Sequence, residues 1–164
     1  MAVRSSFAAI ALRTVFASNA FARSVTGEDE ATIIFTNDAH SAENTARALC
    51  TASTQLASES RAIGELIEFI RSDVHPKYPL IDCLPYGVAY HYGDMPPLVR
   101  ARVEDLFKSG ELRYVCCTST LLQGVNLPAR HIIIEDPRRG RSGPMPRRDF
   151  LNLAGRAGRL LREF

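Results

Sequence analysis

Residues 149–159, near the end of the printed chain, read DFLNLAGRAGR. If this stretch forms a helix, Asn152, Arg156 and Arg159 fall at positions i, i+4 and i+7 and lie on one face. A glycine inside a helix costs about 1 kcal/mol relative to alanine, so the two glycines beside the arginines indicate a helix that another group approaches closely. A polyphosphate, which two guanidinium groups would bind, fits this pattern.

A second informative stretch, residues 117–128, reads CTSTLLQGVNLP. Residues 149–159 resemble motif VI of the superfamily 2 helicases, the DEAD/DEAH-box class, in which the motif reads roughly QxxGRxGR; Asn152 stands where that family has Gln. The GVNLP segment resembles motif V in the superkiller-type branch of the same family. The likeness extends from about Ala31 to the end of the sequence. It implies the second of the family's two RecA-like domains.

Short apolar segments alternate with helical patterns, and this alternation favours an α/β sandwich with a mainly parallel sheet. The resemblance narrows the expectation to a RecA-like three-layer sandwich over residues 28–164. The helix from about residue 97 is expected to bury Leu98 together with the apolar residues that follow it. Strands are expected at residues 31–35, 87–93, 113–117 and 131–134, and further helices near residues 40–49 and 60–74.

Residues 1–27 contain three arginines and no acidic residue. A helix with a linker, an organelle transit peptide and a secretory signal are the interpretations open for this segment. Arg13 interrupts the apolar region and argues against secretion. Because the remaining sequence looks like an internal piece of a larger enzyme, we favour the helix and linker, with organelle targeting left open.

The composition is that of an ordinary globular domain, with 46% hydrophobic and 23% charged residues among 164. A net charge of +2 is too small to indicate nucleic acid by itself. The four cysteines, at positions 50, 83, 116 and 117, match neither a zinc ligand set nor a disulfide framework. We expect reduced cysteines in a cytoplasmic protein, and no membrane role, because no apolar run approaches the roughly 20 residues that span a bilayer.

The resemblance assigns contacts with the nucleic-acid backbone to five residues near the ends of the expected strands. The residues alone leave alternatives open: Thr36 and Asn37 suit helix capping, and Arg100 suits an ion pair with Glu104 at i+4. His91, alone on a strand, has no catalytic partner at a useful spacing and is assigned no role. The five implied residues are Thr36, Asn37, Arg100, Thr118 and Ser119.

The resemblance also implies a nucleotide site shared with another domain. Arg159 is the preferred arginine finger, Arg156 a second finger or a bridge to the other domain, and Asn126 stands where many relatives have Asp. The sequence contains no GxxxxGK[ST] loop, and no DExx box follows an expected strand. ATP and Mg²⁺ would therefore be held mainly by a first RecA-like domain, in cis or in trans, and this chain alone is not expected to hydrolyse ATP. The nucleotide-facing residues would be Gly124, Asn126, Asn152, Arg156 and Arg159.

These expectations combine into one function. The chain is expected to be the C-terminal domain of an ATP-dependent DNA or RNA helicase, supplying arginine fingers and holding the nucleic-acid backbone. The alternative is a non-catalytic nucleic-acid-binding or scaffold module of RecA-like fold. The sequence does not choose between DNA and RNA.

Overall fold

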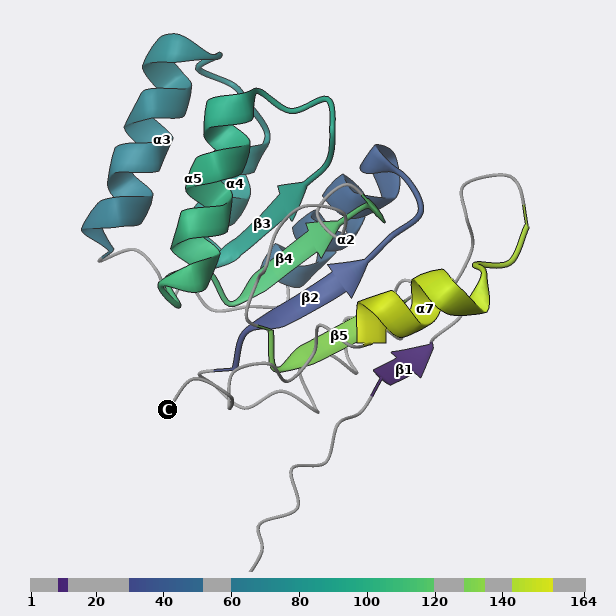
Figure 1. The fold of residues 1–164 in the computed structure, drawn as a ribbon. Helices are drawn as coiled ribbons and strands as arrows, with labels where there is room; N and C mark the ends of the chain where they lie inside the picture. Colours follow the sequence, from purple (N-terminus) through teal and green to yellow (C-terminus); the bar gives the residue numbers. More distant parts are fainter. Residues whose placement is uncertain (1–8, 12–29, 52–59, 120–128, 135–142, 155–164) are drawn as a thin grey trace, which may run out of the picture.

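A parallel sheet forms the centre of this computed structural model, which describes residues 9–11, 30–51, 60–119, 129–134 and 143–154. The strand order is β1-β5-β2-β4-β3, and all four pairings are parallel. The carboxyl ends of the strands therefore meet at one edge of the sheet (Figure 1). The strands are β1 (Ala9–Ala11), β2 (Thr32–Phe35), β3 (Val88–His91), β4 (Tyr114–Cys117) and β5 (His131–Ile134).

Helices cover both faces of this sheet. In the view of Figure 1, α2 lies behind the sheet, α5 and α7 lie in front of it, and α3 lies on the outer side of α5. This arrangement confirms the expected α/β sandwich with a mainly parallel sheet. The helices are α2 (Ala39–Thr51), α3 (Arg61–Asp73), α4 (Leu80–Cys83), α5 (Pro97–Lys108) and α7 (Arg147–Ala154), with a short 3₁₀ helix, η1 (Leu84–Tyr86).

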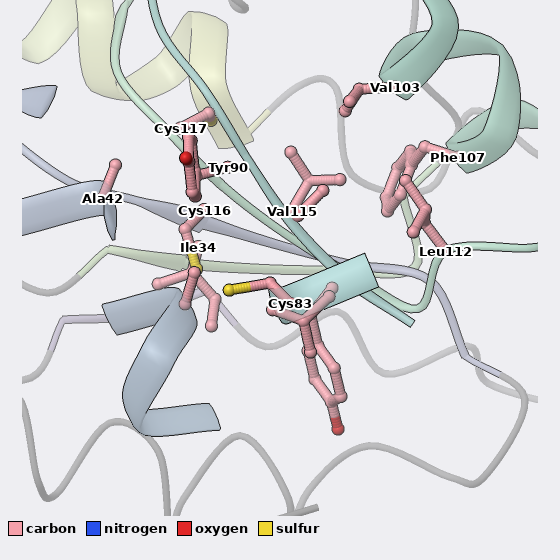
Figure 2. Packing of buried hydrophobic residues seen from close by; sticks show 14 of the residues in the cluster. Ile34, Ala42, Cys83, Tyr90, Val103, Phe107, Leu112, Val115, Cys116 and Cys117 are labelled. Carbon is pink, nitrogen blue, oxygen red and sulfur yellow. The ribbon is translucent and has the colours of Figure 1, made fainter. Parts of the chain in front are cut away.

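Three neighbouring strands of the sheet are buried along their whole length. Every residue of β2, β3 and β4 is buried, which explains why these segments read as continuous apolar runs rather than as alternating patterns. Figure 2 shows Val115 on the side of Val103 and Phe107 from α5, whereas Cys116 lies with Ile34 and Cys83. All four strands that the sequence predicts are confirmed.

Residues 1–27 are described only at Ala9–Ala11, which form strand β1 beside β5. These three residues are strand, not part of a helix. The interpretation of the segment as a helix and linker or as a targeting sequence, and the boundary before residue 28, stay predictions because the other residues lie outside the described part.

One prediction about the core is wrong. Leu98 was expected on the buried face of α5, but it is 66% exposed. It lies on the helix face of Arg102 and Asp105, both exposed, because residues three, four and seven apart share a face. The core instead takes Val99 and the residues Val103, Leu106 and Phe107 from this helix.

All four cysteines are free, and three of them are buried. In the ranges that the structure describes, no helix has the length and apolar character needed to cross a membrane. Those ranges also contain no group of three or more His, Cys, Asp or Glu side chains that could hold a metal ion.

Candidate nucleic-acid interface

Three neighbouring strands bring the predicted backbone-contacting residues to one edge of the sheet. Thr36 follows β2, Thr118 follows β4, and Arg100 lies near the start of α5, the helix after β3. The Thr36 backbone N–H donates to the Cys117 carbonyl oxygen at 2.8 Å, and the Thr118 N–H donates to the His91 carbonyl oxygen at 3.2 Å. The edge is therefore held together by the same hydrogen bonds that join the strands.

Thr36 lies inside this edge rather than on its surface. Its side chain is buried, at 2% exposed, and its hydroxyl lies 3.3 Å from the Cys117 carbonyl oxygen and 3.3 Å from that of Asp38. The helix cap is supplied by Asp38, whose carboxylate accepts from the Ser41 backbone N–H at 2.8 Å. Thr36 thus links β2 to β4 and does not cap α2.

Asn37 differs from its neighbour because part of its side chain reaches solvent. Its Oδ1 atom is nevertheless buried and has no hydrogen-bond partner among the described residues. A buried acceptor without a partner is costly. The described part of the chain therefore leaves the Oδ1 acceptor of Asn37 unsatisfied.

Arg100 does not form the ion pair with Glu104 that the residues alone suggest. Glu104 Oε1 lies 3.0 Å from His91 Nε2 instead, and the His91 side chain is only 3% exposed. Within the described ranges Arg100 forms no ion pair, and its Nε atom is buried without a hydrogen-bond partner. The guanidinium group is thus left available for an anion.

The energetics explain why Glu104 turns toward His91. A hydrogen bond to a charged group contributes about 1.5–3 kcal/mol, whereas an exposed helical ion pair contributes about 0.3–0.5 kcal/mol. An acidic residue that follows the basic one along a helix is also the less favourable orientation. The buried hydrogen bond between Glu104 and His91 is therefore more favourable than an ion pair between Glu104 and Arg100 on the helix surface.

Burial lowers the pKa of His91 below its ordinary value of 6.5. The hydrogen bond to Glu104 opposes this shift, and the positive charge of Arg100 adds to it. Because a lowered pKa keeps the imidazole neutral near pH 7, Nε2 carries the proton that it donates to the Glu104 carboxylate.

The segment that follows β4 is described only as far as Ser119. Thr118 is partly buried and Ser119 is exposed. Gly124 and Asn126 lie outside the described residues, as do Arg156 and Arg159. Their roles stay predictions.

Helix α7 begins two residues before the expected helix, at Arg147, and is described to Ala154. Phe150 is partly buried against the core, so the helix is anchored to the fold. Asn152 lies on this helix, and the description stops before the two arginines that follow it.

The pair formed by His91 and Glu104 is the feature that sequence reasoning missed. The two residues are 13 positions apart on different elements, so no helical or strand periodicity connects them. The i, i+4 spacing on α5 predicts Arg100 as the partner of Glu104. Only the packing of α5 against β3 shows that His91 is the partner instead.

The helicase conserved C-terminal domain family matches residues 16–161. The ATP-dependent DNA helicase Hel308 of Aeropyrum pernix is 40% identical over 83 residues, covering 49% of this chain and 11% of the relative. The Helicase POLQ-like protein of Caenorhabditis elegans is 45% identical over 80 residues, covering 49% of this chain and 9% of the relative. The U5 small nuclear ribonucleoprotein 200 kDa helicase of Caenorhabditis elegans is 32% identical over 137 residues, covering 77% of this chain and 6% of the relative. These matches thus span between 6% and 11% of the length of the relatives.

Proposed function

The chain belongs to the helicase conserved C-terminal domain family, and from this premise we propose that it acts as the C-terminal RecA-like domain of an ATP-dependent DNA or RNA helicase. The observation that carries the proposal is the family match over residues 16–161, joined to a parallel sheet with helices on both faces. Open α/β sheets bind ligands at the carboxyl ends of their strands. Asn37, two residues after β2, and Arg100, near the start of the helix that follows β3, lie at that edge.

The domain holds one nucleic-acid strand by its phosphates. Arg100 provides the main charge, because its guanidinium donates two parallel hydrogen bonds to a phosphate and has no ion pair elsewhere in the described structure. Asn37, Thr118 and Ser119 add polar contacts at the same edge. Thr36 positions the loop from inside, through its bonds to Cys117. Contacts of this kind carry little sequence information, so the binding has low sequence specificity.

The domain also completes a nucleotide site on a first RecA-like domain. Mg-ATP bound there supplies the phosphoryl group. Arg159 places its positive charge against the negative charge that develops in the transition state, and Arg156 supports it or bridges to the other domain. Such a finger contributes about 10³ to 10⁵ in rate. Gly124, Asn126 and Asn152 complete the nucleotide-facing set.

Nucleic-acid-stimulated ATP hydrolysis tests this proposal directly. The chain is joined to the first RecA-like domain of its own helicase, and the Arg159→Ala variant is compared with Arg147→Ala, an exposed arginine on α7. We expect Arg159→Ala to lose about 10³-fold or more in kcat and Arg147→Ala to retain its rate. If Arg159→Ala hydrolysed ATP at nearly the unmodified rate, the finger assignment would be wrong.

The same measurement separates the proposal from a non-catalytic binding module. If the joined protein bound nucleic acid but showed no stimulated hydrolysis, the domain would be a binding or scaffold module. We further propose an intracellular location, since all four cysteines are free.

A further inference from the structure

We propose that His91 is a positioning residue for nucleic-acid binding: it holds the Glu104 carboxylate away from Arg100 and so keeps the guanidinium free for a phosphate. The inference rests on the proposed function and adds a residue that the helicase motifs of this sequence do not include. It starts from the contrast between the ion pair expected at i+4 and the contact observed at 3.0 Å between His91 Nε2 and Glu104 Oε1.

The position of His91 makes it a fixed partner. It is the last residue of β3, its side chain is 3% exposed, and its carbonyl oxygen accepts from the Thr118 N–H at 3.2 Å. The histidine therefore cannot follow Glu104 toward the helix surface. Glu104, with a side chain 19% exposed, is the mobile partner, and it is drawn inward.

The charges show what this contact changes. Arg100 and Glu104 lie one helical turn apart, close enough to pair when nothing else binds the carboxylate. Arg100 is near enough to His91 for its charge to act on the imidazole. If the carboxylate were released from His91, it would neutralise Arg100, and a phosphate would then have to displace it before binding.

The His91→Leu variant tests the inference in the full chain. The probe is a fluorescein-labelled oligothymidylate or oligouridylate of about 20 nucleotides, and fluorescence anisotropy gives Kd as a function of salt. We expect His91→Leu to raise Kd about threefold to tenfold and to reduce the salt slope by about one, toward the values of Arg100→Ala. His91→Gln, whose amide N–H can replace the Nε2 donor, should stay close to the unmodified protein.

The decisive variant is the double substitution His91→Leu with Glu104→Gln. Removing the carboxylate should restore the affinity that His91→Leu loses, because no charge is left to neutralise Arg100. A purely structural role for His91 predicts that the double variant binds as weakly as His91→Leu. That result would overturn the inference.

A single substitution keeps the test valid if His91→Leu does not fold. Glu104→Gln alone should change Kd no more than Asp105→Asn, an exposed acidic residue on the same helix, because His91 already holds the carboxylate away. A gain of threefold or more beyond Asp105→Asn would show that Glu104 pairs with Arg100 and would contradict the inference. If instead Arg100→Ala leaves both Kd and salt slope unchanged, the proposed binding of a phosphate by Arg100 is wrong. That outcome contradicts the proposed function, whereas the outcomes above contradict only the role of His91.

Discussion

Helices α2 and α5 begin at the same edge of the sheet, but their first turns are completed differently. At α2 the Asp38 carboxylate accepts from the Ser41 N–H at 2.8 Å and from the Ser41 hydroxyl at 3.0 Å. At α5 no described side chain caps the helix, which starts with two prolines. Leu98 is 66% exposed there, and Arg100 has no ion pair within the described ranges.

The contrast separates a structural helix start from one that is open to a partner. The start of α2 satisfies its backbone donors with its own chain, so it contributes to stability. The start of α5 leaves Leu98 exposed and Arg100 without an ion pair among the described residues. Neither side chain contributes much to stability, so both are available for binding. The predictions below test whether this division holds.

The largest effect is expected from a pair of leucines on the two helices. Leu49 of α2 is fully buried and Leu98 of α5 is exposed. Leu49→Ala should lower the free energy of unfolding by about 2–5 kcal/mol because it leaves a cavity, whereas Leu98→Ala should change it by less than about 0.5 kcal/mol. Urea unfolding of both variants gives the values. If Leu98→Ala lowered the free energy of unfolding as much as Leu49→Ala does, Leu98 would be packed against the protein and the start of α5 would not be available to a partner.

The cap on α2 should have an intermediate effect. Asp38→Ala removes the acceptor for the Ser41 N–H and should lower the free energy of unfolding by about 1 kcal/mol. Asp38→Asn, whose amide oxygen can still accept, should lose less. Neither variant should weaken nucleic-acid binding, which anisotropy measures. A clear loss of affinity in Asp38→Asn would place the α2 start within the interface.

Acid should act on the α5 side through His91, with the smallest effect. Its pKa in the folded protein lies below the ordinary 6.5, so the unfolded chain takes up the proton first as the pH falls. The contribution of His91 is therefore complete above about pH 6.5 and is lost as the pH falls from there through the folded pKa.

Thermal unfolding between about pH 7.5 and pH 5.5 measures this loss. The Tm of the unmodified protein should fall more than that of His91→Gln, because glutamine does not titrate. Equal falls in Tm for the two proteins would show that other groups carry the acid response.

The strands were predictable because buried parallel strands have a simple signature. Apolar, β-branched runs such as residues 131–134 have no polar alternation, and the helix predicted over residues 60–74 was found at Arg61–Asp73. Strand β1 was not predictable, since three residues, AIA, carry no periodicity and are strand only because β5 lies beside them. Leu98 was misplaced because the apolar pattern of α5 does not show which face the sheet covers.

Sequence reasoning named candidate residues for the site but not the contacts that these residues make. Hydrogen bonds between neighbouring strands place Thr36 and Thr118 at one edge of the sheet, and Arg100 lies on the helix that follows β3. The nucleic-acid contacts of these residues stay predictions. The burial of the Thr36 hydroxyl and the turn of Glu104 toward His91 depend on tertiary packing. No local pattern in the sequence encodes them.

The salt dependence of nucleic-acid binding tests the central claim, that Arg100, which has no ion pair among the described residues, binds a phosphate. Arg100→Ala is compared with Arg102→Ala, an exposed arginine on the same helix, and unfolding in urea confirms that both variants fold. We predict that Arg100→Ala lowers affinity for all sequences alike and reduces the slope of log K against log salt by about one, with little change in Arg102→Ala. An unchanged slope in Arg100→Ala, or equal slopes in the two variants, would contradict the account.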